Sequence, residues 1–165
     1  MRITVRAGRI DQVRGGIQAF GAFEGDRRPQ RLLPASAGAN RSLAALIAGA
    51  GFRGAANETA FLPNGKQWVL VVGLGKAKDL SLEKVRQMAG TAARTVRSRG
   101  YTALSLPVLR DRVLGDAATT AQAVVEGALL GLYRYDRLKQ VPKFEKSKRI
   151  DAITLIVERS GDVAG

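Results

Sequence analysis

The chain has 165 residues, with 27 Lys and Arg against 14 Asp and Glu, which gives a formal net charge of +13. It contains no Cys and no His, which excludes disulfides, thiolate chemistry and any nucleophile of the Ser–His type. The length suits one domain with a core, and no apolar run approaches the roughly 20 residues of a membrane span. The N-terminus alternates like a strand and has no signal-peptide core, so we expect a cytoplasmic protein with no membrane segment.

The sequence pattern in the first third of the chain predicts short strands separated by glycine-containing turns and loops. Alternating or apolar patterns predict strands over residues 1–5 and 17–23. Ser42 can cap a short helix over residues 43–48, which two glycines then end. A further strand is predicted over residues 58–62, and the turn signal at residues 63–66 leads into the next one.

The most informative stretch begins at Trp68. Five apolar residues follow one another from Trp68 to Val72, the pattern of a strand buried on both faces within an α/β sheet. Trp68 opens this strand, so we expect its side chain in the core. Gly73 and Gly75 end the strand and a helix follows, which is half of a βαβ unit.

The second half alternates helices and strands. An apolar stripe at helical spacing predicts a helix over residues 82–99, and alternation predicts a strand over 101–108. Asp116 can cap a third helix that runs to about Tyr133. A basic connector over 134–149 leads to a last strand over 150–157. This order predicts an α/β domain built on a mixed β-sheet with helices on both faces.

Three stretches, taken in order, resemble the N-terminal domain of the leucyl aminopeptidase (cytosol aminopeptidase) family. Residues 52–59 (F-R-G-A-A-N-E-T) resemble the family's F-x-G-K-x-x-E/Q-T, and residues 70–76 (L-V-V-G-L-G-K) resemble its L-V-G-L-G-K strand and turn. Residues 126–139 (E-G-A-L-L-G-L-Y-R-Y-D-R-L-K) resemble E-G-x-x-L-x-x-Y-x-F-D-x-L/Y-K. Each stretch is short, but their order and spacing agree over nearly the whole chain.

The resemblance implies a macro-domain-like fold for residues 1–159 and a linker beginning at 160–165. It implies a parent enzyme that removes N-terminal residues such as Leu from peptides and assembles as a hexamer. Two divalent metals, Mn or Zn, would lie in a separate C-terminal catalytic domain. The family's N-T-D-A-E-G-R and G-K-G-x-x-x-D-S-G-G motifs do not occur in this sequence. We therefore expect no catalytic residue, no metal site and no cofactor in this chain itself.

The turn from Gly73 to Lys76 admits two interpretations. Its amides could form a phosphate-binding nest with a lysine beside it, although the P-loop spacing is absent. Fold analogy with macro domains would make ADP-ribose the ligand. The alternative is a tight turn that ends a strand, and this is the interpretation we favour.

The basic residues support a second function, binding of duplex DNA. Aromatic side chains interleaved with cations suit nucleic acid, and the resemblance adds that some bacterial family members bind DNA through this domain. The alternative is an exposed interdomain connector whose aromatic side chains pack on the core. In that case Asp136 pairs with Arg134 or Arg137, or caps the turn after the helix. The candidate contacts come from the helix over 82–99 and from the connector: Arg94, Arg97, Arg134, Arg137, Lys139, Lys143, Lys146, Lys148 and Arg149.

Overall fold

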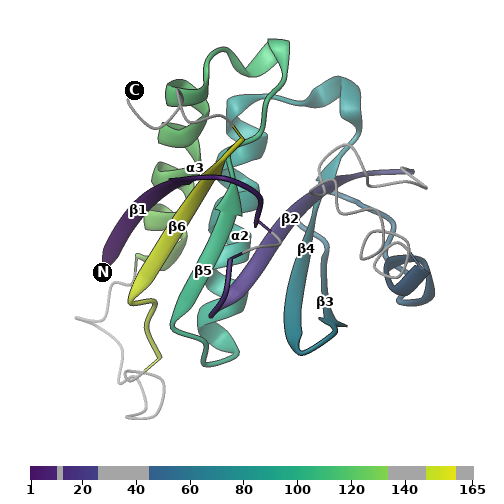
Figure 1. The fold of residues 1–165 in the computed structure, drawn as a ribbon. Coiled ribbons are helices and arrows are strands. Elements are labelled where there is room, and N and C mark those ends of the chain that lie inside the picture. The colour runs from purple at the N-terminus through teal and green to yellow at the C-terminus, as the bar shows by residue number, and fades with distance from the viewer. Residues whose placement is uncertain (11–12, 26–44, 134–147, 159–165) are drawn as a thin grey trace, which may run out of the picture.

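The computed structural model describes residues 1–10, 13–25, 45–133 and 148–158. In the described part of the chain, six strands form one sheet and two long helices accompany it (Figure 1). The strands are β1 (Arg2–Ala7), β2 (Ile17–Phe23), β3 (Thr59–Asn64), β4 (Gln67–Gly75), β5 (Ala103–Pro107) and β6 (Ala152–Val157). The helices are α2 (Leu82–Ser98) and α3 (Ala117–Leu132), with short 3-10 turns η3 (Ala77–Asp79) and η4 (Arg112–Leu114). Residues 45–49 are also helical.

The sheet is mixed, as the sequence predicts. Its strand order is β1-β6-β5-β2-β4-β3, and β3 is antiparallel to β4 while every other pair is parallel. Parallel strands need crossover connections. Helix α3 connects the neighbours β5 and β6, and α2 connects β4 to β5 across the intervening β2. The carboxyl ends of the five parallel strands therefore meet at one edge of the sheet.

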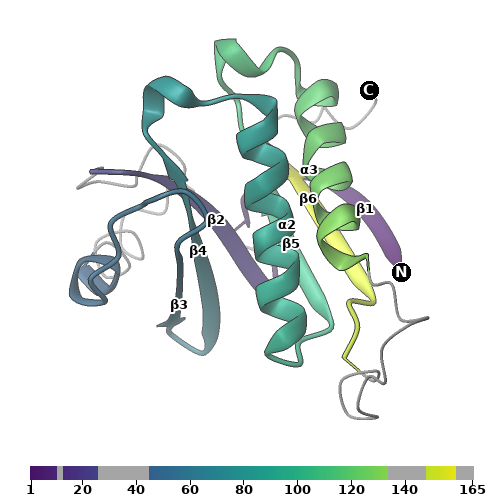
Figure 2. The same cartoon turned by 180° about the vertical axis from the view of Figure 1, so that it is seen from behind.

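Both long helices cover the same face of the sheet (Figure 2). Strand side chains alternate between this face and the opposite one. Leu70 and Val72 of β4 belong to the core cluster under α2 and α3, whereas Val69 and Val71 belong to a second cluster. Ile47, from the helical residues 45–49, packs into that second cluster, so described helices do lie on both faces, although very unequally.

The capping prediction for Asp116 is confirmed, because its carboxylate accepts a hydrogen bond from the Thr119 amide at 2.7 Å. Hydrogen bonds from Thr119 lower the pKa of Asp116 from its ordinary value of 3.8. The Ser81 hydroxyl, for which no cap was predicted, accepts a hydrogen bond from the Lys84 amide at 3.3 Å. Ser42, the other predicted cap, lies outside the described residues. No helix in the described ranges is long and apolar enough to span a bilayer.

One local prediction is confirmed and one is wrong. The turn signal at residues 63–66 does lead into β4 at Gln67, and the turn itself is Gly65 and Lys66, because Asn64 already pairs with Gln67. Trp68, predicted to lie in the core, is 44% exposed, because it sits at the amino end of β4, next to the edge strand β3. Its ring stacks on Phe61, with centroids 5.3 Å apart and an interplanar angle of 18°.

Candidate functional site

The glycines that end β4 are held by the loop before β3. The Gly73 amide donates to the carbonyl of Glu58 at 2.7 Å, and the Gly75 amide donates to the carbonyl of Gly54 at 2.9 Å. A Cβ on Gly73 would lie 1.8 Å from the carbonyl oxygen of Ala55. These amides already have protein acceptors, so the contacts support a strand end rather than a phosphate-binding nest.

The same loop is organised by one carboxylate. Glu58 accepts hydrogen bonds from the amides of Arg53, at 3.0 and 3.2 Å, and of Ala55, at 3.0 Å. These bonds fold residues 53–58 tightly enough to approach β4. The first two family-like stretches thus lie against each other, and the residues that match the family motifs contribute to this packing.

The third family-like stretch joins α3 to α2. Arg86 Nε donates to Glu126 Oε2 at 2.7 Å, and Gln122 donates to the other carboxylate oxygen at 2.7 Å. The hydrogen bond from Arg86, and then the one from Gln122, lower the pKa of Glu126 from its ordinary value of 4.5. Gly127 lies against the backbone of Arg86, where a Cβ would be 2.2 Å from the carbonyl oxygen. The described part of this stretch, residues 126–133, therefore contributes to helix packing.

Four of the nine candidate DNA contacts lie in the described residues, and each has a partner in the protein. Two of them bind helix ends: Arg97 Nη1 donates to the last carbonyl of α3, that of Leu132, at 2.8 Å, and Lys148 Nζ donates to Ser98 O at the end of α2 at 2.9 Å. A cation at a helix C-terminus also interacts favourably with the helix dipole.

The other two described candidates are more exposed. Arg149 forms an ion pair with Asp151 at 2.8 Å, and Arg94 donates to the Thr91 hydroxyl at 3.1 Å. The remaining candidates lie outside the described residues: Arg134, Arg137, Lys139, Lys143 and Lys146. Asp136, the acidic residue expected to pair within this segment, lies there as well.

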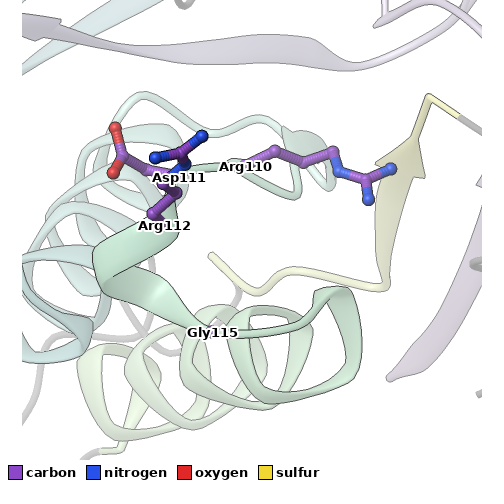
Figure 3. Close-up of a pocket in the computed structure, with 4 residues that line it drawn as sticks. All are labelled: Arg110, Asp111, Arg112 and Gly115. Atoms are coloured by element: carbon purple, nitrogen blue, oxygen red, sulfur yellow. The ribbon is translucent and has the colours of Figure 1, made fainter.

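A hollow of about 640 Å³ lies in the loop after β5 (Figure 3). Arg110, Asp111, Arg112 and Gly115 line it, and Arg110 extends toward the end of β6. No function was predicted for this loop, although its three charged residues follow a predicted strand and so lie at the sheet edge where ligands usually bind. The hollow combines two guanidinium groups with one carboxylate, so its lining is polar but not strongly cationic.

The described residues do not fit a two-metal site. No group of three or more His, Cys, Asp or Glu comes together among them, and the whole sequence has neither His nor Cys. Asp116 and Glu126, the carboxylates with lowered pKa values, hold a helix start and a helix–helix contact. Both carboxylates therefore stabilise the fold through these hydrogen bonds.

Comparison with known proteins agrees with the family resemblance. The model of the cytosol aminopeptidase family, N-terminal domain, matches residues 19–142. A probable cytosol aminopeptidase of Roseiflexus castenholzii is 30% identical over 162 residues, covering 94% of this chain and 30% of that protein. The one from Nitratidesulfovibrio vulgaris is 37% identical over 120 residues, covering 67% of this chain and 24% of the relative. The chain thus spans less than a third of the length of either relative.

Solved structures show the same fold. A tomato leucine aminopeptidase mutant superposes with a TM-score of 0.73 at 18% identity, covering 98% of this chain and 34% of its own. The bottromycin maturation enzyme BotP superposes with a TM-score of 0.61 at 29% identity, covering 92% of this chain and 29% of its own. The family match over most of the chain, together with this shared fold, shows that the chain belongs to the cytosol aminopeptidase family as its N-terminal domain.

Proposed function

We propose that this chain is the non-catalytic N-terminal domain of a cytosolic, metal-dependent leucyl aminopeptidase. The parent enzyme removes N-terminal amino acids from peptides and works as a hexamer. Two divalent metals, Mn or Zn, belong to a separate C-terminal domain. The N-terminal domain assists assembly or access to that catalytic domain.

One observation carries this proposal: the chain matches only the N-terminal domain of a family whose members are much longer. It covers 24% of the relative from Nitratidesulfovibrio vulgaris and 30% of the one from Roseiflexus castenholzii. The residue chemistry points the same way. The described parts of the three family-like stretches pack the fold together, and no three described Asp or Glu side chains form a group that could hold a metal ion. Catalytic groups are therefore expected in the part of the enzyme that lies beyond this domain.

The test is a peptidase assay on two proteins. The purified 165-residue chain, supplied with Mn²⁺ or Zn²⁺, should not hydrolyse a leucine amide substrate. The product of the complete coding frame should hydrolyse it and lose activity on chelation. Turnover by the 165-residue chain alone, or a coding frame that ends at codon 165, would contradict the proposal.

DNA binding is the second candidate function, and the net charge of +13 favours it. If about six phosphates are contacted, affinity for duplex DNA should fall on the order of a thousandfold between about 50 and 200 mM salt. Replacing Lys143, Lys146, Lys148 and Arg149 by Ala should flatten this dependence. Because Lys148 also binds the end of α2, the thermal stability of the variant must be measured alongside. Absence of binding at low salt would end this hypothesis.

A further inference from the structure

An apolar surface remains exposed along α3 and the edge strand β1. Helix α3 has 16 residues and a single charged side chain, Glu126, although one of its sides faces away from the sheet. Helices that are apolar nearly all round are normally buried. The exposed side chains that form what we call the α3–β1 surface are Ile3 (37%), Val5 (38%), Leu129 (43%), Leu130 (72%) and Tyr133 (72%).

Topology brings these residues to the same end of the sheet. Helix α3 leads into β6 and runs opposite to it, whereas β1 is parallel to β6. The last turn of α3 and the first residues of β1 therefore share one edge, and both views place them next to each other (Figures 1 and 2). Ile3 and Val5 pair in register with Ile153 and Leu155 of the helix-side core, so they face the same side of the sheet as α3.

The helix layer is too narrow for the sheet. Six strands at about 4.8 Å spacing are wider than two helices packed about 8–10 Å apart. At the β3 edge, Phe61 is covered by Trp68 and by the guanidinium of Arg99, 4.3 Å from its ring centroid. At the β1 edge, the exposures of Ile3 and Val5 show that no described residue provides similar cover.

We propose that the α3–β1 surface is where the catalytic domain of the parent enzyme docks, presenting an apolar segment to Leu129, Leu130 and Tyr133. This inference rests on the proposed function. The lengths of the relatives indicate what covers this surface. More than two thirds of each relative lies outside the region that this chain matches, and we infer that this remaining part contains the domain that docks here. A second copy of this chain is disfavoured, because it would bring one net charge of +13 against another.

Leu130→Lys tests the docking surface, with Val113→Lys as the matched control. Val113 is 64% exposed and lies in η4, at the opposite end of the sheet from the last turn of α3. Both variants are made in the 165-residue chain and in the product of the complete frame. In the short chain neither should move the thermal midpoint by more than about 2 °C, because both side chains face solvent.

The readout is hydrogen–deuterium exchange of peptides covering β1 and the last turn of α3. We expect exchange at least about tenfold slower in the complete protein than in the 165-residue chain. Leu130→Lys should abolish that protection in the complete protein, and Val113→Lys should preserve it. Equal exchange in both proteins, or protection that survives Leu130→Lys, would overturn the inference.

The outcomes separate this inference from the proposed function. Protection lost in Leu130→Lys, in a complete protein without peptidase activity, supports docking and contradicts the enzyme assignment. Peptidase activity in a complete protein whose α3 is not protected supports the enzyme assignment and contradicts docking. If the 165-residue chain instead sediments as a dimer that Leu130→Lys dissociates, the occupant is a second copy and the inference is wrong.

Discussion

At the scale of single residues, the family-like glycines are explained by contact distances. Gly73 is the clearest case, because the loop carbonyl of Ala55 occupies the space that any Cβ would need. The neighbouring hydrogen bond from the Gly73 amide to Glu58 fixes this approach. The glycine near the end of this buried strand therefore allows two backbone segments to approach closely, and it does not indicate a ligand site.

Gly73→Ala should destabilise the fold by about 3 kcal/mol or more, because neither backbone segment can move freely to relieve the clash. Gly49→Ala is the control, since a Cβ there meets nothing within 4 Å. Its effect should be neutral or stabilising by up to about 1 kcal/mol, because Gly49 ends the helical residues 45–49 and alanine has the higher helix propensity. Urea titrations of the three proteins measure both values, and equal midpoints for the Gly73 and Gly49 variants would refute the packing explanation.

Glu126 should make stability depend on pH in the acidic range. The hydrogen bond from Arg86, and then that from Gln122, lower the pKa of its carboxyl below 4.5 in the folded state. A lowered folded-state pKa contributes stability above the unfolded-state pKa and loses it as the pH falls through the folded-state pKa. The stability difference between wild type and Glu126→Gln should therefore be largest near neutral pH and shrink below about pH 4.5.

Thermal midpoints measured between about pH 7 and pH 3 test this dependence. Glu83→Gln is the control, because Glu83 lies 4.0 Å from the same guanidinium, with its side chain 63% exposed. Its difference from wild type should stay small throughout. A Glu126→Gln difference that grows on acidification would have the wrong sign for the proposed cause.

At the scale of elements, α2 and α3 are held together by small residues and by Arg97 of α2, while Lys148, from the segment before β6, binds the end of α2. Gly90 faces Gly131 and lies close to Gly127, so the two backbones approach closely. Arg97 and Lys148 then bind the terminal carbonyls of α3 and α2. Apolar periodicity and capping residues could predict both helices, but not the role of these cations, because that depends on which chain segments meet.

Gly131→Ala tests the close approach of the helices. In an isolated helix this change would be favourable by about 1 kcal/mol, because alanine has the higher helix propensity. Here the added Cβ would lie 2.6 Å from both Cα and O of Gly90, so we expect net destabilisation of about 1–3 kcal/mol. Ala118→Leu, at an exposed position of α3, should be nearly neutral. A stabilised Gly131→Ala variant in chemical denaturation would show that the helices can separate at little cost.

At the scale of the whole molecule, the sequence predicts strand and helix positions better than their assembly. The strand over 17–23 and the helix from Leu82 are found where the periodicity places them. The insertion of β6 between β1 and β5 could not be predicted, because strand pairing depends on contacts between segments about 150 residues apart. The same limit explains Trp68: an apolar run shows that a strand is buried, but not which of its ends emerges at the edge of the helix layer.

The net charge of +13 should make the stability of the domain rise with salt. Repulsion among like charges destabilises the compact state, and added ions screen it over the Debye length, about 8 Å at physiological ionic strength. We expect the thermal midpoint to rise by about 3 °C between low salt and about 0.3 M NaCl.

Glycine betaine, a zwitterion that adds no ionic strength, controls for excluded-solute effects. The double variant Arg14→Glu/Lys66→Glu, which lowers the net charge to +9, should rise less, since each substitution replaces an exposed cation by an anion. A midpoint that falls with salt would mean that attractive ion pairs such as Arg86–Glu126 outweigh the overall repulsion.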